Sequence, residues 1–260
     1  MISVESWGIA GSVVDRGRVG LAWLGQSRRG AADVVSLSLA NRLVGNSKGS
    51  AAIESSGGLV LRFDQPTMVA IAGALADLTV TGGPVVGWGS PVSLPAGTRL
   101  RVGRLIDGAR LYLAVRGGIT RADHHLSVGA DPHTPAASQP APRAAFPLQL
   151  RVWPGPRMDW FESAAWSSLL SGRFEVTSTS RVGVRLSGIP LLRGHDRQLP
   201  SEGLVEGAIQ VPPDGQPIVM LADHPTTGGY PVIAVIDPAD LHHAAQAAPG
   251  GTTLRFALAR

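Results

Sequence analysis

The sequence predicts a mainly β protein with a few short helices, and two observations support this fold class. Glycine and proline are abundant, at 33 and 20 of 260 residues, and they cut the chain into short segments that suit strands joined by turns. The segments between them are rich in branched apolar residues or alternate between apolar and polar positions, as half-buried strands do. With 44% hydrophobic residues, the chain can bury a sizeable core, as one unit or as two lobes.

The first half of the chain is predicted to contain one helix among strands. Residues 3–14 read as one or two short strands. Residues 33–46 read as a helix, because Asp33 is a suitable N-cap and Gly45 a suitable stop. Further short strands are expected at 59–63, 68–72, 78–81, 99–102 and 110–115, with hairpin turns at Gly82-Gly83 and Asp107-Gly108.

A change in composition divides the chain. Residues 131–147 contain five prolines and much alanine, which is typical of an exposed linker or lid. We therefore expect a single domain over residues 1–260. It consists of a lobe over residues 1–130, this linker, and a second lobe over residues 148–260.

The second lobe is predicted to contain a clear hairpin. Residues 205–211 and 218–223 both alternate between apolar and polar positions, and Pro212-Pro213-Asp214-Gly215 separates them. Proline fixes φ and glycine supplies a positive φ, so this tetrapeptide favours a turn. The other elements expected in this lobe are strands at 151–153, 173–178, 182–186 and 253–257, and helices at 159–170 and 237–246.

Composition excludes several classes of function. The absence of cysteine rules out disulfides, thiolate metal sites and thiol nucleophiles. The single lysine and the scattered arginines do not form the clusters typical of nucleic-acid binders, so we expect no nucleic-acid partner. We also expect no metal: the pairs His124-His125 and His242-His243 should point their rings apart, which suits a surface better than a metal site.

The N-terminus lacks the basic start and apolar run of a signal peptide. The longest nearly apolar run, residues 68–78, is shorter than the roughly 20 residues that a membrane-spanning helix needs. We therefore expect no membrane association and a cytoplasmic location.

The loop Thr226-Thr227-Gly228-Gly229-Tyr230 is the best candidate for a binding loop. Its two glycines allow the backbone to approach a ligand closely and to turn N–H groups toward it. Together with two hydroxyls, such a loop suits a phosphate or a developing oxyanion. Tyr230 can close over the ligand. The alternative is a plain tight turn with a packed tyrosine.

Polar residues surround this loop in the sequence. Glu202 begins the hairpin region, Gln210 belongs to it, and Asp223 ends its second strand. A strand that ends in a carboxylate beside a glycine loop is a suitable place for a general base or an orienting group. Asp214 is interpreted as a turn residue only, since the order proline, aspartate, glycine is so frequent in turns.

Charged residues outside the hairpin are further candidates. Asp15 and Arg18 lie close together near the N-terminus, and Arg181 and Arg185 follow a strand of the second lobe. Arginine binds carboxylates and phosphates through two parallel hydrogen bonds. Structural ion pairs at an interface of the lobes are an equal alternative.

The chain also resembles a known family over nearly its whole length, the allophanate hydrolase subunit 2 family. This family includes the C subunit of bacterial ATP-dependent 5-oxoprolinase and the carboxyltransferase part of urea amidolyase. The matching motifs lie in residues 201–218, Ala222-Asp223, residues 226–231, residues 15–18, residues 30–33, residues 39–46, Glu54, residues 114–118, residues 154–156 and residues 159–161.

This resemblance implies two cyclophilin-like β-barrel lobes and work with partner subunits. These are a subunit 1 homologue (the B subunit) and, for 5-oxoprolinase, a third lactam-utilisation subunit (the A subunit). The implied reaction opens the lactam of 5-oxo-L-proline to L-glutamate with ATP hydrolysis, and ATP binds this chain or a partner. Phosphorylation of the amide oxygen would create a leaving group that water displaces.

We accordingly predict two sets of site residues for the amide substrate. The catalytic set is Asp223, Glu202 and Asp15. The set that binds substrate or phosphate is Thr226, Thr227, Gly228, Gly229, Tyr230, Gln210, Arg18, Arg181 and Arg185.

The chain departs from the family pattern at several positions. Val14 and Pro225 stand where glutamine is usual, Ser180 stands for an aspartate, Val182 for a methionine, Val184 for a tyrosine, and Glu202 for an aspartate. Two other functions stay open. One is a biotin-dependent carboxyltransferase or urea-degrading subunit, which would receive carboxybiotin from another protein, because Lys48 lies in no biotin-attachment motif. The other is a non-catalytic protein that regulates a subunit 1 homologue of the kinase-inhibitor type.

Overall fold

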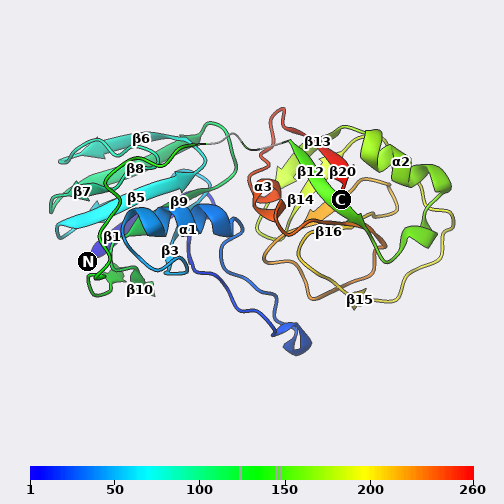
Figure 1. Ribbon diagram of the computed structural model, residues 1–260, viewed down its shortest axis with the longest axis horizontal. Helices are drawn as coiled ribbons and strands as arrows, with labels where there is room; N and C mark the ends of the chain where they lie inside the picture. The colour runs from blue at the N-terminus through cyan, green and yellow to red at the C-terminus, as the bar shows by residue number, and fades with distance from the viewer. Residues whose placement is uncertain (123–124, 144–145, 147) are drawn as a thin grey trace. The chain divides into compact units, whose positions relative to one another are not determined.

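The computed structural model describes residues 1–122, 125–143, 146 and 148–260 (Figure 1). By contacts the chain forms two compact units. The first unit comprises Met1–Gly17 and Asp33–Ala145, and the second comprises Arg18–Ala32 and Phe146–Arg260. The described residues form mainly β-strands with three short α-helices, which confirms the predicted fold class.

The first unit consists of two antiparallel sheets whose inner faces share one core, as in a sandwich. The six-stranded sheet has the order β10-β11-β1-β4-β8-β6, and the five-stranded sheet the order β2-β3-β9-β5-β7. The strands are β1 (Ile2–Ser6), β2 (Ser12–Val14), β3 (Ala52–Ser55), β4 (Val60–Phe63), β5 (Thr67–Gly73), β6 (Ala76–Thr81), β7 (Val92–Leu94), β8 (Arg99–Leu105), β9 (Leu111–Val115), β10 (Ile119–Ala122) and β11 (His125–Val128).

Helix α1 (Val34–Leu43) packs against β5 and β9 (Figure 1). It begins as predicted at the N-cap Asp33, whose carboxylate accepts a hydrogen bond from the Ser36 backbone N at 2.8 Å. The Asp33 backbone N donates to the Tyr112 hydroxyl at 2.8 Å, and that hydroxyl donates to Glu54 at 2.6 Å. Burial, followed by the nearby carboxylates of Glu54 and Asp33, raises the pKa of Tyr112 well above its ordinary value. This buried network fixes the start of α1 on the sheet.

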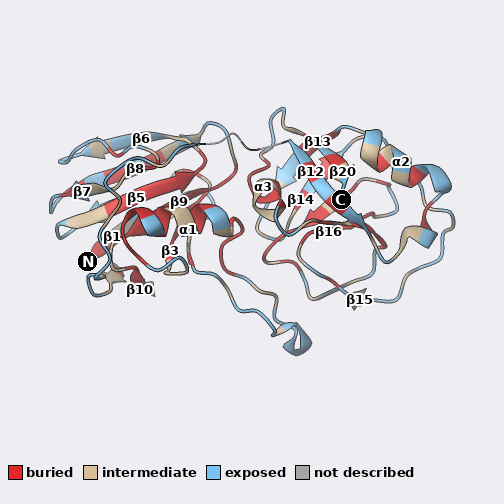
Figure 2. Ribbon diagram, viewed as in Figure 1, coloured by how far each residue is buried: buried red, intermediate tan, exposed pale blue. Residues whose placement is uncertain are grey.

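The second unit is built on a closed barrel of seven strands in the order β12-β19-β16-β17-β14-β13-β20. Its apolar side chains form a second core (Figure 2). The barrel strands are β12 (Gln149–Pro154), β13 (Phe174–Thr179), β14 (Gly183–Ser187), β16 (Ala208–Gln210), β17 (Ile218–Met220), β19 (Val232–Ile236) and β20 (Thr253–Leu258). A separate two-stranded ribbon joins β15 (Glu202–Gly203) to β18 (Thr227–Gly228), and α2 (Ser163–Ser171) packs against β20.

The predicted hairpin is present as β16 and β17, which pair antiparallel with Ile209 opposite Val219. Gly215 has a φ of 74°, and its backbone N donates to the Pro212 carbonyl at 3.0 Å. A Cβ at this position would lie 2.9 Å from the Pro190 side chain. The turn therefore needs glycine for both its conformation and its packing.

Two predicted helices of the second unit were wrong in extent. Residues 159–170 are interrupted, because Phe161 adopts an extended conformation and forms a β-bridge with Arg193. A short 3-10 helix, η2 (Met158–Trp160), precedes this break and α2 follows it. Helix α3 (Leu241–Ala245) begins later than the predicted residue 237, because a turn precedes it. In this turn the Ala239 backbone N donates to the Asp237 carboxylate, and the Asp240 backbone N donates to the Asp237 carbonyl.

Residues 131–143 of the predicted linker belong to the first unit and are held to it. Arg116 pairs with Asp131 and donates to the Pro132 carbonyl at 2.8 Å. Further along, the Ala137 backbone N donates to Leu43 O, and Arg143 pairs with Asp107. Residues 144, 145 and 147, and His124 of the predicted histidine pair, lie outside the described residues.

Residues 18–32 leave the first unit and belong to the second. Arg28 forms two hydrogen bonds to Glu206 at 2.8 and 2.9 Å, and the Arg29 backbone N donates to Ala222 O at 3.1 Å. Ala32 packs in the barrel core. The chain thus passes between the units three times.

Among the described residues, no helix has the length and apolar character needed to cross a membrane.

Candidate functional site

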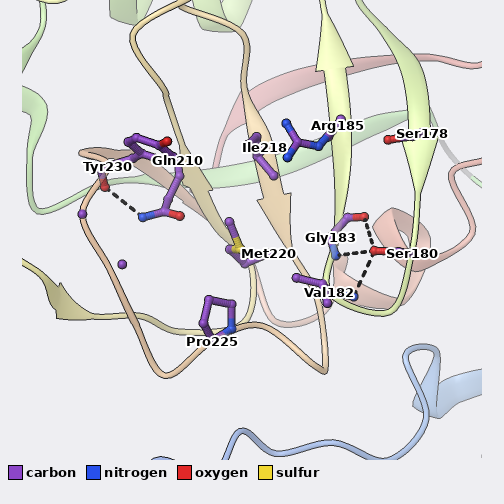
Figure 3. Close-up of a pocket in the computed structure, with 12 residues that line it drawn as sticks. Ser178, Ser180, Val182, Gly183, Arg185, Gln210, Ile218, Met220, Pro225 and Tyr230 are labelled. Atoms are coloured by element: carbon purple, nitrogen blue, oxygen red, sulfur yellow. Dashed lines mark hydrogen bonds between the residues drawn. The ribbon is translucent and has the colours of Figure 1, made fainter.

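A cavity of about 480 Å³ lies on the outer side of the barrel in the second unit (Figure 3). On β14 the buried Val184 and Leu186 face the core, so Arg185 between them faces the cavity side. Ile218 and Met220 reach the cavity from β17 by the same alternation. The residues that line the cavity are Ser178, Ser180, Val182, Gly183, Arg185, Gln210, Ile218, Met220, Pro225, Gly228, Gly229 and Tyr230.

Arg185 is the one basic side chain among the lining residues. Figure 3 shows its guanidinium directed across the cavity toward Ile218. No carboxylate of the described part of the chain pairs with it. An unpaired guanidinium beside an apolar floor favours the binding of an anion, above all a planar carboxylate.

Gln210 forms the polar wall of the cavity. Its side chain is only 3% exposed, and its Nε2 donates to the Tyr230 carbonyl at 2.9 Å. That hydrogen bond fixes the amide, and it leaves the Oε1 atom as an acceptor for a ligand. A Cβ on the neighbouring Gly228 would lie 2.7 Å from Gln210 Nε2, so glycine is what allows this close approach.

Two turns contribute further polar groups to the cavity. The Ser180 hydroxyl accepts from the backbone N atoms of Val182 and Gly183 at 3.2 and 3.3 Å, which shapes the tip of the β13–β14 hairpin (Figure 3). Tyr230 is 44% exposed, and the Arg193 guanidinium lies 6.0 Å from its ring centre. A cation at that distance attracts the ring face and stabilises its position.

Five of the predicted site residues therefore share one cavity: Arg185, Gln210, Gly228, Gly229 and Tyr230. Thr226 and Thr227 serve the neighbouring ribbon instead: Thr226 O accepts from the Leu204 backbone N at 2.9 Å, and Thr227 pairs with Gly203. Neither threonine is among the lining residues.

The predicted carboxylates do not line the cavity either. Asp223 forms an ion pair with Arg181 at 2.8 Å, and Arg181 also donates to the Gly30 carbonyl at 2.6 Å. Glu202 forms an ion pair with Arg157, and this side-chain hydrogen bond lowers the pKa of Glu202. Both acids are engaged by arginine, which suits them to hold loops in place.

The two candidates near the N-terminus fall in different units. Asp15 belongs to the first unit, where its carboxylate accepts from the Gly17 backbone N at 2.7 Å and forms a local turn. Arg18 belongs to the second unit, where its backbone N donates to Arg28 O at 2.7 Å.

Sequence reasoning missed seven lining residues as site residues: Ser178, Ser180, Val182, Gly183, Ile218, Met220 and Pro225. A signal was present for three of them. Ser180, Val182 and Pro225 are among the departures from the family pattern, and all three line the cavity. Half of the six departures therefore line the cavity, while Val14, Val184 and Glu202 do not.

The described residues contain no group of acidic or histidine side chains placed to hold a metal ion. For His242 and His243, the expectation that their rings point apart was wrong. Their ring centres lie 3.7 Å apart, with the ring planes tilted by 40° to each other.

Taken together, the cavity offers one cation, one fixed amide and a glycine loop above an apolar floor. This set can bind a small molecule that carries both a carboxylate and an amide. It includes no side-chain carboxylate to act as a general base, so a catalytic base would have to come from outside this cavity.

Comparison with known proteins gives a consistent family relation. A family model described as "Carboxyltransferase domain, subdomain A and B" matches residues 24–131 and 120–258. The C subunit of the Escherichia coli (strain K12) 5-oxoprolinase is 34% identical to this chain, over 98% of the chain and 90% of that protein.

Solved structures agree with the fold. The crystal structure of TTHA0988 matches with a TM-score of 0.81 and 34% identity. The match covers 98% of this chain and 55% of the TTHA0988 chain. The crystal structure of the K. lactis urea amidolyase matches with a TM-score of 0.88 and 25% identity. The match covers 100% of this chain and 19% of the urea amidolyase chain. The chain thus spans about half of the one protein and about a fifth of the other.

Proposed function

The chain belongs to the family of carboxyltransferase domains with subdomains A and B, and on this premise we propose that it is one component of an ATP-dependent 5-oxoprolinase. This enzyme opens 5-oxo-L-proline to L-glutamate. The relation to the C subunit of the Escherichia coli enzyme supports the proposal, because it extends over 98% of this chain. A homologue of the B subunit and a third, lactam-utilising A subunit would complete the enzyme, and we place the complex in the cytoplasm.

The observation that carries this proposal is that Arg185 lines a small cavity and pairs with no carboxylate among the described residues. 5-Oxoproline bears one carboxylate next to a five-membered cyclic amide. The guanidinium would bind the carboxylate, while the Gln210 amide and the Gly229 backbone N–H would meet the lactam. The cavity volume of about 480 Å³ lies within the roughly 300–1,000 Å³ that small-molecule sites have.

ATP does not fit the charges of this cavity. Recognition of a triphosphate uses several cations together with Mg²⁺, whereas the lining provides a single guanidinium and no acidic side chain. We therefore propose that ATP is bound by a partner. In this division of work, the present chain binds the amide substrate and holds it in one orientation.

The proposal is tested by reconstitution. The chain is co-expressed with homologues of the A and B subunits, and glutamate released from 5-oxoproline is measured with and without ATP. We expect ATP-dependent release. If every component is folded and present and no glutamate appears, the proposed function is wrong.

A matched pair of variants tests the role of Arg185. Arg185→Gln removes a charge-assisted hydrogen bond worth about 1.5–3 kcal/mol, so KM for 5-oxoproline should rise about 10- to 100-fold. Arg173→Gln removes another exposed arginine of the same unit that lines no part of the cavity, and it serves as the control. Equal KM values for the two variants would contradict the assignment of Arg185.

A biotin-dependent carboxyltransferase is a second candidate, favoured by the TM-score of 0.88 to the K. lactis urea amidolyase. This chain would not carry biotin itself, since its single lysine, Lys48, lies between Ser47 and Gly49. A biotin carboxylase, a biotinylated carrier, labelled bicarbonate, ATP and urea would be incubated with the chain. Labelled carboxylated urea would favour this activity, and its absence alongside glutamate release would favour the first.

A further inference from the structure

Residues 18–28, which belong to the second unit, form an exposed arm that is drawn in blue in Figure 1. Its tip is the 3-10 helix η1 (Ala22–Leu24), none of whose residues is buried. Val19 is 85% exposed, Trp23 80% and Leu24 52%, and Figure 2 shows the tip as exposed. Single exposed apolar side chains are ordinary on protein surfaces, but three on one short segment, including a tryptophan, are not.

The arm has internal hydrogen bonds that give it a defined shape. At its base, the Arg18 backbone N donates to Arg28 O at 2.7 Å. At its tip, the backbone N atoms of Leu24 and Gln26 both donate to Leu21 O, at 3.0 and 3.3 Å. Gly25 closes the turn in the left-handed region with a φ of 73°. The tip therefore holds its apolar side chains outward.

The base of the arm is anchored firmly to the barrel. Arg28 forms two hydrogen bonds with Glu206 and a third with the Ala31 carbonyl at 3.0 Å. Directly beyond it, Arg181 binds the Gly30 carbonyl. The exposed side chains of the tip gain nothing from burial when the chain folds. Order without burial is typical of a preformed binding element, whose ordering cost is already met before the partner arrives.

We propose that the arm docks into a groove of a partner subunit, with Trp23 as the central contact and Val19 and Leu24 beside it. Tryptophan is enriched among the residues that contribute most to binding energy at protein interfaces. The proposal rests on the proposed function only in the choice of partner, the homologue of the B subunit. The 55% coverage of TTHA0988 is consistent with a neighbour, because this chain aligns with only part of that longer polypeptide.

Charge defines the chemistry of the groove. Arg18 at the base of the arm and Arg29 just beyond it pair with no carboxylate among the described residues. The groove that fits is therefore apolar at its floor and bordered by carboxylates. Such complementarity mainly sets specificity and the rate of association, so binding should weaken as salt rises.

The absence of cysteine makes a direct test simple. Ala22→Cys introduces a single thiol at the tip, which is labelled with an environment-sensitive fluorophore. The purified homologue of the B subunit is then titrated in, and calorimetry on the unlabelled chain gives the Kd. We expect a saturable blue shift of the fluorophore with the same Kd.

Matched variants separate the arm from other apolar surface. Trp23→Ser should weaken the Kd at least about 30-fold, as expected for a central interface residue. Val19→Ser should weaken it by a smaller factor. Val85→Ser should leave it within about twofold, although Val85 is also 85% exposed. Since all three side chains are exposed, the melting temperatures should stay unchanged.

The proposal would be overturned by an unchanged Kd for Trp23→Ser, by a fluorophore that does not respond to bound partner, or by no binding of the wild-type chain. Self-association of the chain that Trp23→Ser abolishes would also overturn it, in favour of a second copy as the occupant. The proposed function fails separately, by the absence of glutamate release from the complete set of components.

Discussion

Two arginines four positions apart show how one residue type takes two roles. Arg181 is held by Asp223 and by the Gly30 carbonyl, whereas Arg185 meets no carboxylate among the described residues. Sequence alone placed both in one binding set. What separates them is that the fold brings Asp223 and the Gly30 carbonyl, both distant in the sequence, to Arg181, and brings no carboxylate of the described residues to Arg185.

The first prediction concerns Asp223. Asp223→Asn removes one charge of a partly buried pair, and we expect a stability loss of about 1–2 kcal/mol, between the values for exposed and buried pairs. The catalytic constant of the folded protein should change less than tenfold. Thermal unfolding and steady-state kinetics are measured on the same preparation. A catalytic constant that falls more than a hundredfold with an unchanged Tm would instead make Asp223 catalytic.

At the scale of single residues, sequence predicted part of the cavity. Gln210, Gly228, Gly229 and Tyr230 were predicted because strand alternation and a glycine pair are local signals. Ser178 and Met220 were not, because their position in the cavity depends on how β13 and β17 are arranged in the barrel. Such pairings join residues that are distant along the chain, so no local pattern reports them.

Between elements, the ribbon β15–β18 borders the cavity and depends on a glycine. Gly228→Ala would place a Cβ 2.7 Å from both Gln210 Nε2 and the Leu204 side chain, so one of them must move. We expect KM for 5-oxoproline to rise at least about tenfold, with a Tm loss of a few degrees. Gly203→Ala on the opposite strand is the control, because its Cβ would meet no atom within 4 Å. Equal effects of both substitutions would contradict this.

A second prediction at this scale concerns acid stability. Asp240, before α3, binds Arg151 of β12, and that side-chain hydrogen bond lowers the pKa of Asp240. The stability from this pair is therefore present above about pH 4 and is lost as the pH falls through the lowered pKa. Asp240→Asn should lower the Tm by about 2–4 °C at pH 7.

The control for Asp240 is the pH dependence itself. The difference in Tm between the wild type and Asp240→Asn should shrink as the pH falls from about 5 to about 2.5, because protonation removes the same charge from the wild type. A difference that stays constant over this range would contradict the role of the ionised pair.

Most strands could be predicted from the sequence, while the limits of the helices could not. Strands such as β4 and β9 follow from branched residues bounded by turns. The helix over residues 159–170 failed because Phe161 pairs with Arg193, a contact between distant positions that no local periodicity indicates. Asp237 began a turn rather than a helix, because its side chain accepts from Ala239 N.

At the scale of the whole molecule, the two units are interwoven along the chain. The second unit includes residues 18–32, which the sequence assigned by position to the first lobe. The reason is physical: Ala32 packs in the barrel core, and Arg28 and Arg29 bind Glu206 and Ala222. Composition identifies a proline-rich segment easily, but it does not reveal that the short segment 18–32 packs with the second unit.

A fragment experiment tests this arrangement. Residues 146–260 alone lack the segment that fills part of their core and pairs with Glu206, so they should unfold at a lower temperature than the same residues fused to residues 18–32 through a Gly/Ser linker. Thermal unfolding by circular dichroism compares the two. The control fusion replaces Arg28 and Ala32 by serine. Equal melting temperatures for all three fragments would show that the segment contributes nothing.

The same crossing has a consequence for how the chain is made. Residues 18–32 leave the ribosome early, whereas β20, which closes the barrel, ends at residue 258. At about 5–20 residues per second, the delay is on the order of ten to fifty seconds. During that time Trp23 and Leu24 lie on a segment with nothing to hold it, the kind of apolar stretch that chaperones bind. Trp23 and Leu24 are therefore exposed on an unfolded segment during synthesis, and they stay exposed in the folded chain.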